Sequence, residues 1–380
     1  MTNLFLFSLL LLFVIPVYSQ SDTVMYFEEY NPPSSLIVPE HHLTSAKFPF
    51  VDVHNHQWDM SEEHLNRVAE EMKKLNMAVL VNLSGRGFTR IETEPGKFEY
   101  RMKGLQYLKD GIKNVNESNP NKFIIFTNID FLEFGEDGWT ERILDELETD
   151  VKNGAAGLKI YKNLGLTLKD NRGKRVAVDD PRLDPIWNKC GVLGIPVLIH
   201  TGEPFQFWLP KDKNNERWLE LKQRPGRYRD PAENPAWEEI MEEQHNVFRK
   251  HPHTIFINAH LGWLGNDLSR LSKLMDELPN MYTEIGAVLA ELGRQPRFAR
   301  EWFIKYQDRI MFGKDSWHPE EYYVYFRVLE TPDEYFDYYR KRHAFWKMYG
   351  LNLPDDVLKK IYYKNALRII PGIDKSLFPD

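Results

Sequence analysis

The sequence has little cysteine and no excess of basic residues. Cys190 is the single cysteine among 380 residues, so the chain can form neither an intramolecular disulfide nor a zinc site built from cysteines. Its 49 lysine and arginine residues stand against 56 aspartate and glutamate residues, which gives a net charge of −7. Phosphate backbones are bound by dense positive charge, so this balance argues against nucleic acid as a partner.

Linkers, low-complexity stretches and short repeats are also missing after a proline-containing lead-in. We therefore expect one continuous domain over residues 48–380, preceded by a lead-in over residues 20–47. A chain that is 42% hydrophobic and 28% charged is typical of a globular protein with a sizeable core, and this composition excludes disorder, collagen and coiled coil.

The N-terminus holds the one long apolar run, Leu4–Val17. This run of 14 residues is shorter than the ~20 that a membrane span requires, and a small residue, Ser19, follows it. We expect residues 1–19 to be a signal peptide and the mature protein to be exported, to a periplasm or as a secreted protein. No membrane anchor is then expected after cleavage; a transmembrane anchor is the alternative.

Short apolar runs alternate with charge-rich stretches along the rest of the chain. Eight runs have strand character: Phe48–Val53, Met77–Leu83, Phe123–Ile129, Ala155–Ile160, Ile195–Ile199, Thr254–Asn258, Met281–Ile285 and Ile310–Phe312. The stretches between them show helical periodicity, as in Glu62–Leu75, Trp139–Lys152, Pro235–Lys250 and Leu268–Leu278. Buried strands that alternate with helices indicate parallel pairing, and eight such units predict an α/β fold of the (β/α)8, TIM-like barrel type. An open doubly wound sheet is the alternative, but no glycine-rich phosphate loop follows the first run.

Histidines and one aspartate stand where these runs end. His54 and His56 end the first run, His200 the fifth and His260 the sixth, and Asp315 follows the eighth. Chemistry in a barrel lies at the carboxyl ends of the strands, where these side chains meet. Each histidine alone could be a hydrogen-bonded core residue, but together the five residues predict a divalent metal site with open positions for water or substrate.

This order of residues resembles the amidohydrolase superfamily, in particular the branch that contains aminocarboxymuconate-semialdehyde decarboxylase, resorcylate decarboxylases, hydratases and lactonases. The likeness spans residues 48 to 370, and Ile361–Arg368 resembles the closing helix of that branch. It implies a barrel of the metal-dependent hydrolase type that holds one divalent ion, zinc in the first place and manganese in the second. The ligands implied are His54, His56, His200 and Asp315, and His260 would be a further ligand or the group that moves the proton.

Lys159 in the fourth run leaves three interpretations open. It could bind a substrate carboxylate, or it could be carboxylated and bridge two metal ions, as in other branches of the superfamily. It could also be a lysine at a strand edge whose stem is buried and whose ammonium reaches water.

Arginines and aromatic residues populate the loops expected on the same face. Candidate substrate-binding residues are Lys159, Arg86 after the second run, Trp317 beside Asp315, and three arginines in the insertion after the fifth run, Arg224, Arg227 and Arg229. Because arginine forks bind carboxylate or sulfate, the insertion is a candidate anion clamp. Phe205, Phe207 and Trp208 are a candidate platform for a sugar ring, with ordinary packing as the alternative.

These features predict an exported, metal-dependent lyase that dehydrates a carboxylate-bearing sugar, such as a uronate-terminated oligosaccharide. His260 would remove a proton with help from Asp315, and His318 or Tyr161 would assist the departing hydroxyl. Hydrolysis of a lactone, amide or ester is the alternative, and a non-catalytic periplasmic anion-binding protein is the second. The expected partner is a small-molecule or oligosaccharide substrate, and a homo-oligomer stays open.

Overall fold

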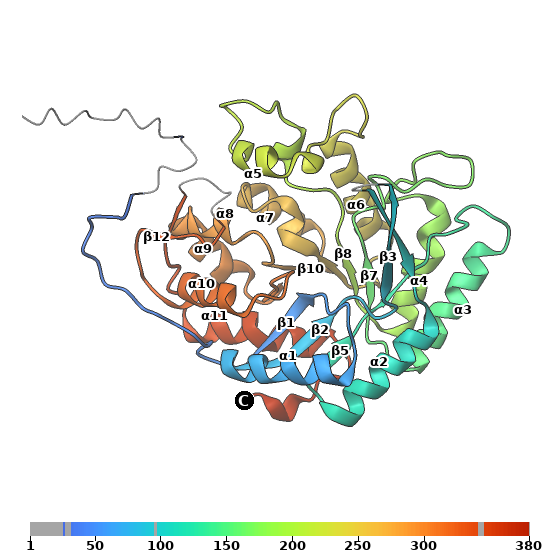
Figure 1. Ribbon diagram of the computed structural model, residues 1–380, viewed down its shortest axis with the longest axis horizontal. Coiled ribbons are helices and arrows are strands. Elements are labelled where there is room, and N and C mark those ends of the chain that lie inside the picture. The colour runs from blue at the N-terminus through green and yellow to red at the C-terminus, as the bar shows by residue number, and fades with distance from the viewer. Residues whose placement is uncertain (1–25, 27–31, 95–96, 341–345, 380) are drawn as a thin grey trace, which may run out of the picture. The chain divides into compact units, whose positions relative to one another are not determined.

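Strands and helices alternate along the chain from residue 50 onward in the computed structural model (Figure 1). The structure describes residues 26, 32–94, 97–340 and 346–379. The expected signal peptide, residues 1–19, lies outside the described residues. The chain divides into two units, Met1–Ser35 and Leu36–Asp380, and the few described positions of the first unit form no helix or strand.

The second unit is built on two parallel sheets. The first has the order β1 (Phe50–Asn55), β2 (Met77–Asn82) and β5 (Phe123–Ile125). The second joins six strands in the order β11-β10-β9-β8-β7-β6. Their bounds are Ile310–Met311 for β11, Met281–Glu284 for β10, Phe256–Asn258 for β9, Val197–Ile199 for β8, Leu158–Ile160 for β7 and Thr127–Asn128 for β6.

Backbone hydrogen bonds join the edges of the two sheets. Phe126, between β5 and β6, donates its backbone N–H to Asn82 O and accepts from Gly85 N, so β5 and β6 are two parts of one strand. At the other edge, Val53 N donates to Phe312 O at 3.0 Å and Asp315 N donates to His54 O at 2.7 Å. The described residues therefore give eight parallel strands in chain order, with the last beside the first, which confirms the expected barrel and excludes the open sheet.

Helices follow the strands and surround them, as Figure 1 shows. The longer ones are α1 (Glu62–Leu75), α2 (Leu105–Ser118), α3 (Trp139–Lys152), α4 (Asp184–Leu193), α6 (Trp237–Lys250), α7 (Leu268–Glu277), α9 (Pro296–Tyr306) and α10 (Pro319–Glu330). The shorter ones are α5 (Trp218–Gln223), α8 (Leu289–Gly293), α11 (Asp355–Lys359) and α12 (Asn365–Ile369). Within the described part of the chain, no helix combines the length and the apolar character that a membrane span needs.

Helix α1 illustrates how local sequence sets these elements. The Ser61 hydroxyl accepts a hydrogen bond from His64 N at the start of the helix, where two glutamates complement the helix dipole. Asn76 ends it in the left-handed conformation, with φ of 62°. The buried residues recur at helical spacing, so one face packs on the strands: Leu65, Val68, Met72 and Leu75.

Two insertions follow the carboxyl ends of strands β2 and β8. An antiparallel hairpin, β3 (Phe88–Glu94) and β4 (Lys97–Met102), follows β2. A longer insertion after β8 contains the short helix Phe205–Trp208, helix α5 and a turn over Pro225–Arg227. A second, two-residue pairing joins β12 (Phe336–Asp337) to β13 (Lys347–Met348).

Candidate metal centre

His54, His56 and Asp315 meet at the carboxyl ends of β1 and β11. The Asp315 Oδ1 atom lies 3.3 Å from His54 Nε2 and 3.8 Å from His56 Nε2. One ligand atom from each of the three residues lies within 4.8 Å of the other two, which is a spacing that could hold a metal ion. Asp315 has a φ of 81°, an uncommon value for a residue with a side chain, and its N–H is held by His54 O.

Hydrogen bonds on the far side of each ring orient the two histidines. His54 Nδ1 donates to Glu284 Oε1 at 2.9 Å, and His56 Nδ1 lies 3.0 Å from Ser84 Oγ. A carboxylate oxygen only accepts, so Nδ1 of His54 carries the hydrogen and Nε2 keeps its lone pair. Such partners behind the ring are the usual arrangement of metal-binding histidines.

His200 supplies a further free nitrogen. His260 Nδ1 donates to Gly286 O at 2.8 Å, so His260 Nε2 bears a lone pair and accepts from His200 Nδ1 at 3.3 Å. The second nitrogen of His200, Nε2, is buried and has no hydrogen-bond partner among the described residues. A buried nitrogen without a partner costs free energy, and a bound cation would satisfy it.

The protonation states also suit a cation. Burial lowers the pKa of His56 to about 3, and it holds the pKa values of His54 and His200 well below the usual range. Burial acts to raise the pKa of Asp315, but the nearby His54 and His260 outweigh it and the pKa falls below its ordinary value. Neutral imidazoles and an ionised carboxylate are the forms in which these side chains bind metals, so the residues present fit a divalent ion.

Lys159, in β7, is a buried lysine beside this group. Its side chain is 1% exposed, and its Nζ lies 3.5 Å from His54 Nε2 and 5.4 Å from the centre of the Tyr161 ring. Burial lowers its pKa to about 7. The interpretation of Lys159 as an edge residue that reaches water is therefore wrong, whereas substrate binding and carboxylation stay predictions.

Comparison with known proteins identifies the family of this chain. An amidohydrolase family model, Amidohydro_2, matches residues 133–372, more than half of the sequence. The chain belongs to this amidohydrolase family. This membership confirms the resemblance seen in the sequence and the expectation that the protein is an enzyme.

A curated relative of this amidohydrolase is 2-amino-3-carboxymuconate-6-semialdehyde decarboxylase from Dictyostelium discoideum. The two are 32% identical over 133 residues, which cover 32% of this chain and 33% of the relative. The chain thus matches about a third of the length of that relative.

Two solved decarboxylase structures share the fold. Dihydroxybenzoic acid decarboxylase from Polaromonas sp., with bound manganese and the inhibitor 2-nitroresorcinol, matches with a TM-score of 0.52 and 14% identity, over 87% of this chain and 99% of that one. A 2,6-dihydroxybenzoate decarboxylase in complex with 2,6-dihydroxybenzoate matches with a TM-score of 0.50 and 13% identity, over 85% and 99% of the two chains. At these identities the likeness shows the fold.

The two candidate acids of the amidohydrolase have different surroundings. The Tyr161 ring stacks on His56, with ring centres 5.6 Å apart, and its hydroxyl donates to Leu83 O at 3.0 Å. Burial raises the pKa of this hydroxyl above its ordinary value. His318 is exposed at the start of α10, and the Trp317 ring packs edge-on against Tyr322. The acid role of Tyr161 or His318 stays a prediction.

Arg86 has a different place from the one expected. It is buried, its Nε and Nη2 donate to Asp150 at 2.7 and 3.0 Å, and its Nη1 donates to Glu146 at 2.7 Å. These bonds connect the end of β2 to α3. Arg86 is therefore part of a buried ion pair instead of the substrate contact predicted from the sequence.

The arginine insertion is also paired within the protein. Arg227 donates to Glu220, and Arg229 donates to Glu203 at 3.1 Å. Arg224 is exposed before the turn at Pro225. Two of the three guanidinium groups already bind carboxylates, so the expected anion clamp is not assembled in this arrangement.

The expected aromatic platform is packing. Phe207 and Trp208 are buried in the hydrophobic core, and Phe205 packs edge-on against Trp237 with ring centres 6.1 Å apart. Two other aromatic residues approach the centre instead. Trp58 stacks near His56 at 6.1 Å, and Phe88 of the hairpin lies 5.3 Å from Trp58.

Glu284 is a residue of the centre that the sequence interpretation missed although a strand end points to it. It ends the seventh strand, β10, where the rule applied to the other strand ends points to a polar side chain of the site. The rule was sufficient to find it. Ser84 and the aromatic residues Trp58 and Phe88, by contrast, come to the centre through loops and the hairpin, whose course the strand pattern does not determine.

Proposed function

We propose that this amidohydrolase is a metal-dependent lyase that acts on a small substrate bearing a carboxylate. The observation that carries the proposal is the group His54, His56 and Asp315 with the buried Lys159 Nζ 3.5 Å from His54 Nε2. A cation site beside a buried amine favours an anionic substrate, and both charges lie where negative charge would develop in a reaction. The decarboxylase relative from Dictyostelium discoideum supports the lyase class.

The residues that would hold the ion are His54, His56, His200 and Asp315. A divalent metal there would supply Lewis acidity toward a carboxylate or enolate oxygen. The sequence favours zinc, and the manganese in the Polaromonas structure supports manganese for this chain as well. One ion accounts for the ligands, and a second would require carboxylated Lys159.

Side chains of the protein would bind the negative charge of the substrate and transfer the proton. Lys159 in its ammonium form would bind the substrate carboxylate. His260 Nε2, which bears a lone pair because Nδ1 donates to Gly286 O, is the nitrogen that would hold or move a proton. In decarboxylation the bond to the carboxyl carbon breaks, CO2 leaves and the remaining carbon takes a proton. In dehydration His260 would remove the proton and hydroxide would leave as water.

The more specific function predicted from the sequence, dehydration of a carboxylate-bearing sugar, stays part of the proposal. Dehydration of a uronate-terminated oligosaccharide by an exported enzyme is supported by the apolar N-terminal run and by the expected lyase chemistry. The arginine insertion does not add support, because Arg227 and Arg229 are paired. Decarboxylation of a small unsaturated or aromatic acid is the better supported of the two reactions.

Mass spectrometry of a substrate panel tests the proposal. Purified protein is incubated with unsaturated and aromatic carboxylic acids, uronate-terminated oligosaccharides, and lactones, with and without a chelator. We expect a product lighter by one CO2 or one water, lost with the chelator and restored by zinc or manganese. Asp315→Asn should lower kcat/KM at least about 100-fold, or about 3 kcal/mol of transition-state stabilisation.

Each alternative has its own outcome in this experiment. A product heavier by one water from a lactone, with no loss of CO2 or water from any acid, would replace the lyase with a hydrolase. If the chelator left turnover unchanged, the reaction would not depend on a metal ion. Binding of the acids without turnover of any compound would favour the anion-binding protein.

A further inference from the structure

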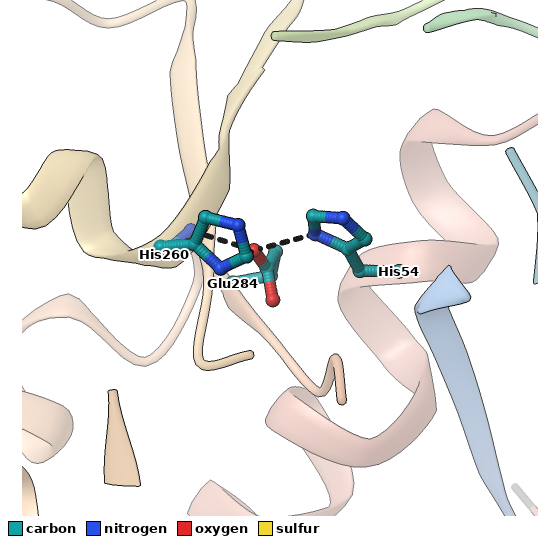
Figure 2. A group of neighbouring side chains, drawn as sticks. All are labelled: His54, His260 and Glu284. Carbon is teal, nitrogen blue, oxygen red and sulfur yellow. Dashed lines mark hydrogen bonds and ion pairs between the residues drawn. The ribbon is translucent and has the colours of Figure 1, made fainter. Parts of the chain in front are cut away.

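Glu284 lies behind the metal centre, between two of its histidines. Figure 2 shows its carboxylate between the His54 ring and the backbone of His260, with a dashed contact to each. The side chain is fully buried and ends β10. It therefore links the strand ends of β1, β9 and β10 at one point.

Three N–H groups converge on this carboxylate. Oε1 accepts from His54 Nδ1 at 2.9 Å and from His260 N at 2.6 Å, and Oε2 accepts from Gly286 N at 2.5 Å. A buried carboxylate with several donors is the kind of group that fixes its partners in one geometry. His260 begins a stretch of positive φ values, 58° at His260 and 54° at Leu261, so the bond to His260 N holds a strained turn.

Two glycines leave the space that the carboxylate occupies. A Cβ on Gly313 would lie 2.2 Å from Glu284 Oε2, and a Cβ on Gly286 would lie 2.7 Å from the same atom. Any side chain at either position would displace the carboxylate. The space around the Glu284 carboxylate is thus left by the backbone of the segments that follow β10 and β11.

We propose that Glu284 is a positioning residue that fixes the Nδ1–H form of His54 and thereby sets the affinity of the centre for its metal. Because Glu284 Oε1 only accepts, His54 must donate from Nδ1, and its Nε2 lone pair is aimed toward Asp315 at 3.3 Å. Through His260 N and Gly286 N, the same carboxylate holds the segment that carries the proposed proton-handling histidine. This inference rests on the metal centre of the proposed function.

A second ion between His54, His260 and Glu284 is the competing role, since ligand atoms of these three lie within 4.8 Å of one another. The Nδ1 atoms of both histidines and the Glu284 carboxylate already have protein partners. His54 Nδ1 and His260 N donate to Glu284 Oε1, and His260 Nδ1 donates to Gly286 O. The hydrogen bonds account for the geometry, so we assign positioning rather than a second metal site.

Glu284→Gln tests this assignment. The amide has the size of the carboxylate but only one accepting oxygen. It cannot accept hydrogen bonds at the Oε1 position and at the Oε2 position together, so at least one of the three N–H groups loses its acceptor. We expect the Kd for zinc or manganese, measured by competition with a chromophoric chelator, to rise about 10- to 100-fold. In metal-free protein with ¹⁵N-labelled histidine, the His54 signal should move from the Nδ1–H toward the Nε2–H form.

Glu243→Gln is the matched control. Glu243 is a buried glutamate of α6 that accepts from two nitrogens of Arg175 and from Val178 N. Its substitution should lower the melting temperature and leave the metal Kd and the His54 signal unchanged. A role of Glu284 in stability alone would make the two variants behave alike, which would overturn the proposal.

Glu284→Asp keeps the experiment decisive if the glutamine variant does not fold. The shorter carboxylate keeps its charge and its acceptors but reaches less far, so we expect its metal Kd to be about 3- to 10-fold above that of the wild type. Wild-type affinity in either variant would overturn the proposal. Metal binding is measured without substrate, so a wild-type protein that binds metal but shows no lyase turnover would refute the proposed function and leave this inference standing.

Discussion

At the scale of single residues, the ring nitrogen that carries the hydrogen determines which nitrogen of each histidine can bind a cation. His54 and His260 each donate from Nδ1 to a protein oxygen, and His56 has Ser84 Oγ beside its Nδ1. When Nδ1 donates to a protein oxygen, the lone pair lies on Nε2, on the side of the ring away from that oxygen. Burial keeps the imidazoles of His54, His56 and His200 neutral by lowering their pKa values. These side chains therefore have the protonation states that suit a cation before any ion binds.

His245 lies in α6, away from the centre, and we expect it to make folding stability depend on pH. Its side chain is buried and its Nε2 has no hydrogen-bond partner among the described residues. Burial lowers its pKa to about 4, whereas histidine in an unfolded chain has a pKa of about 6.5. Between these values the unfolded chain binds a proton that the folded chain does not, so stability falls as the pH drops.

His245→Leu should remove this contribution. In the wild type, His245 alone should lower the free energy of unfolding by about 2 kcal/mol between pH 7 and pH 5, at about 1.4 kcal/mol per pH unit below pH 6.5. Urea unfolding of both proteins at the two pH values measures the difference. An equal loss of stability in wild type and variant would show that His245 takes up its proton in the folded protein.

At the scale of elements, the β3–β4 hairpin and the loop after β1 bring aromatic rings to the centre. Trp58 is 46% exposed and Tyr100 is 59% exposed, and their ring centres lie 6.5 Å apart. Phe88 lies 5.3 Å from Trp58 and 5.4 Å from Tyr161, which itself stacks on His56. Exposed aromatic faces beside a reactive centre suit contact with a substrate ring or an unsaturated chain.

Trp58→Ala should weaken substrate binding more than catalysis. The ring contacts His56 from the exposed side and bonds to no reacting group, so we expect KM to rise about tenfold with kcat changed less, the pattern of lost uniform binding. Steady-state kinetics on the substrate found by the panel measures the two constants. Phe298→Ala, at an exposed phenylalanine of α9, is the control and should change neither. A fall in kcat at constant KM would contradict a binding role.

A helical segment near the end of the chain shows how an element far along the sequence supports the site. A π-helical turn over Lys360–Lys364 joins α11 to α12. Asn365 Nδ2 donates to Gln307 O and to Ile310 O, both at 2.7 Å, which holds the start of β11. This strand leads to Asp315. The expected closing helix over Ile361–Arg368 therefore supports the strand that leads to the candidate ligand Asp315.

At the scale of the whole molecule, buried ion pairs join the insertion after β8 to the segment after β10. Arg217 is buried, donates to Glu220 at 2.9 Å and forms an ion pair with Glu291 of α8. Glu216 and Arg294 form a more exposed pair across the same two segments. A buried pair contributes little by itself, but the loss of one partner leaves the other charge buried.

Arg217→Ala should therefore destabilise the fold strongly. We expect the free energy of unfolding to fall by about 3 to 5 kcal/mol, because Glu220 and Glu291 lose their shared cation. Arg294→Ala at the more exposed pair should cost about 1 kcal/mol or less. Urea unfolding at pH 7 compares them. Equal effects of the two substitutions would mean that the buried network does not hold the insertion in place.

The sequence alone determined the barrel and most of the residues that gather at its candidate metal centre. Each of the eight apolar runs overlaps a strand of the structure, because the alternation of buried strands and amphipathic helices is a local property. Strand ends in a parallel barrel meet on one face by topology. Knowing where each strand ends was therefore sufficient to place His54, His56, His200, His260 and Asp315 together.

Only the tertiary structure decided the partners of charged and aromatic side chains. His54 and Glu284 are 230 residues apart in the chain, and their hydrogen bond depends on the order in which the barrel brings the strands together. Arg86, Arg227 and Arg229 were expected to bind substrate, but each forms an ion pair with a carboxylate of the protein itself. A guanidinium binds whichever carboxylate packing brings to it, and the sequence around it does not specify which one that will be.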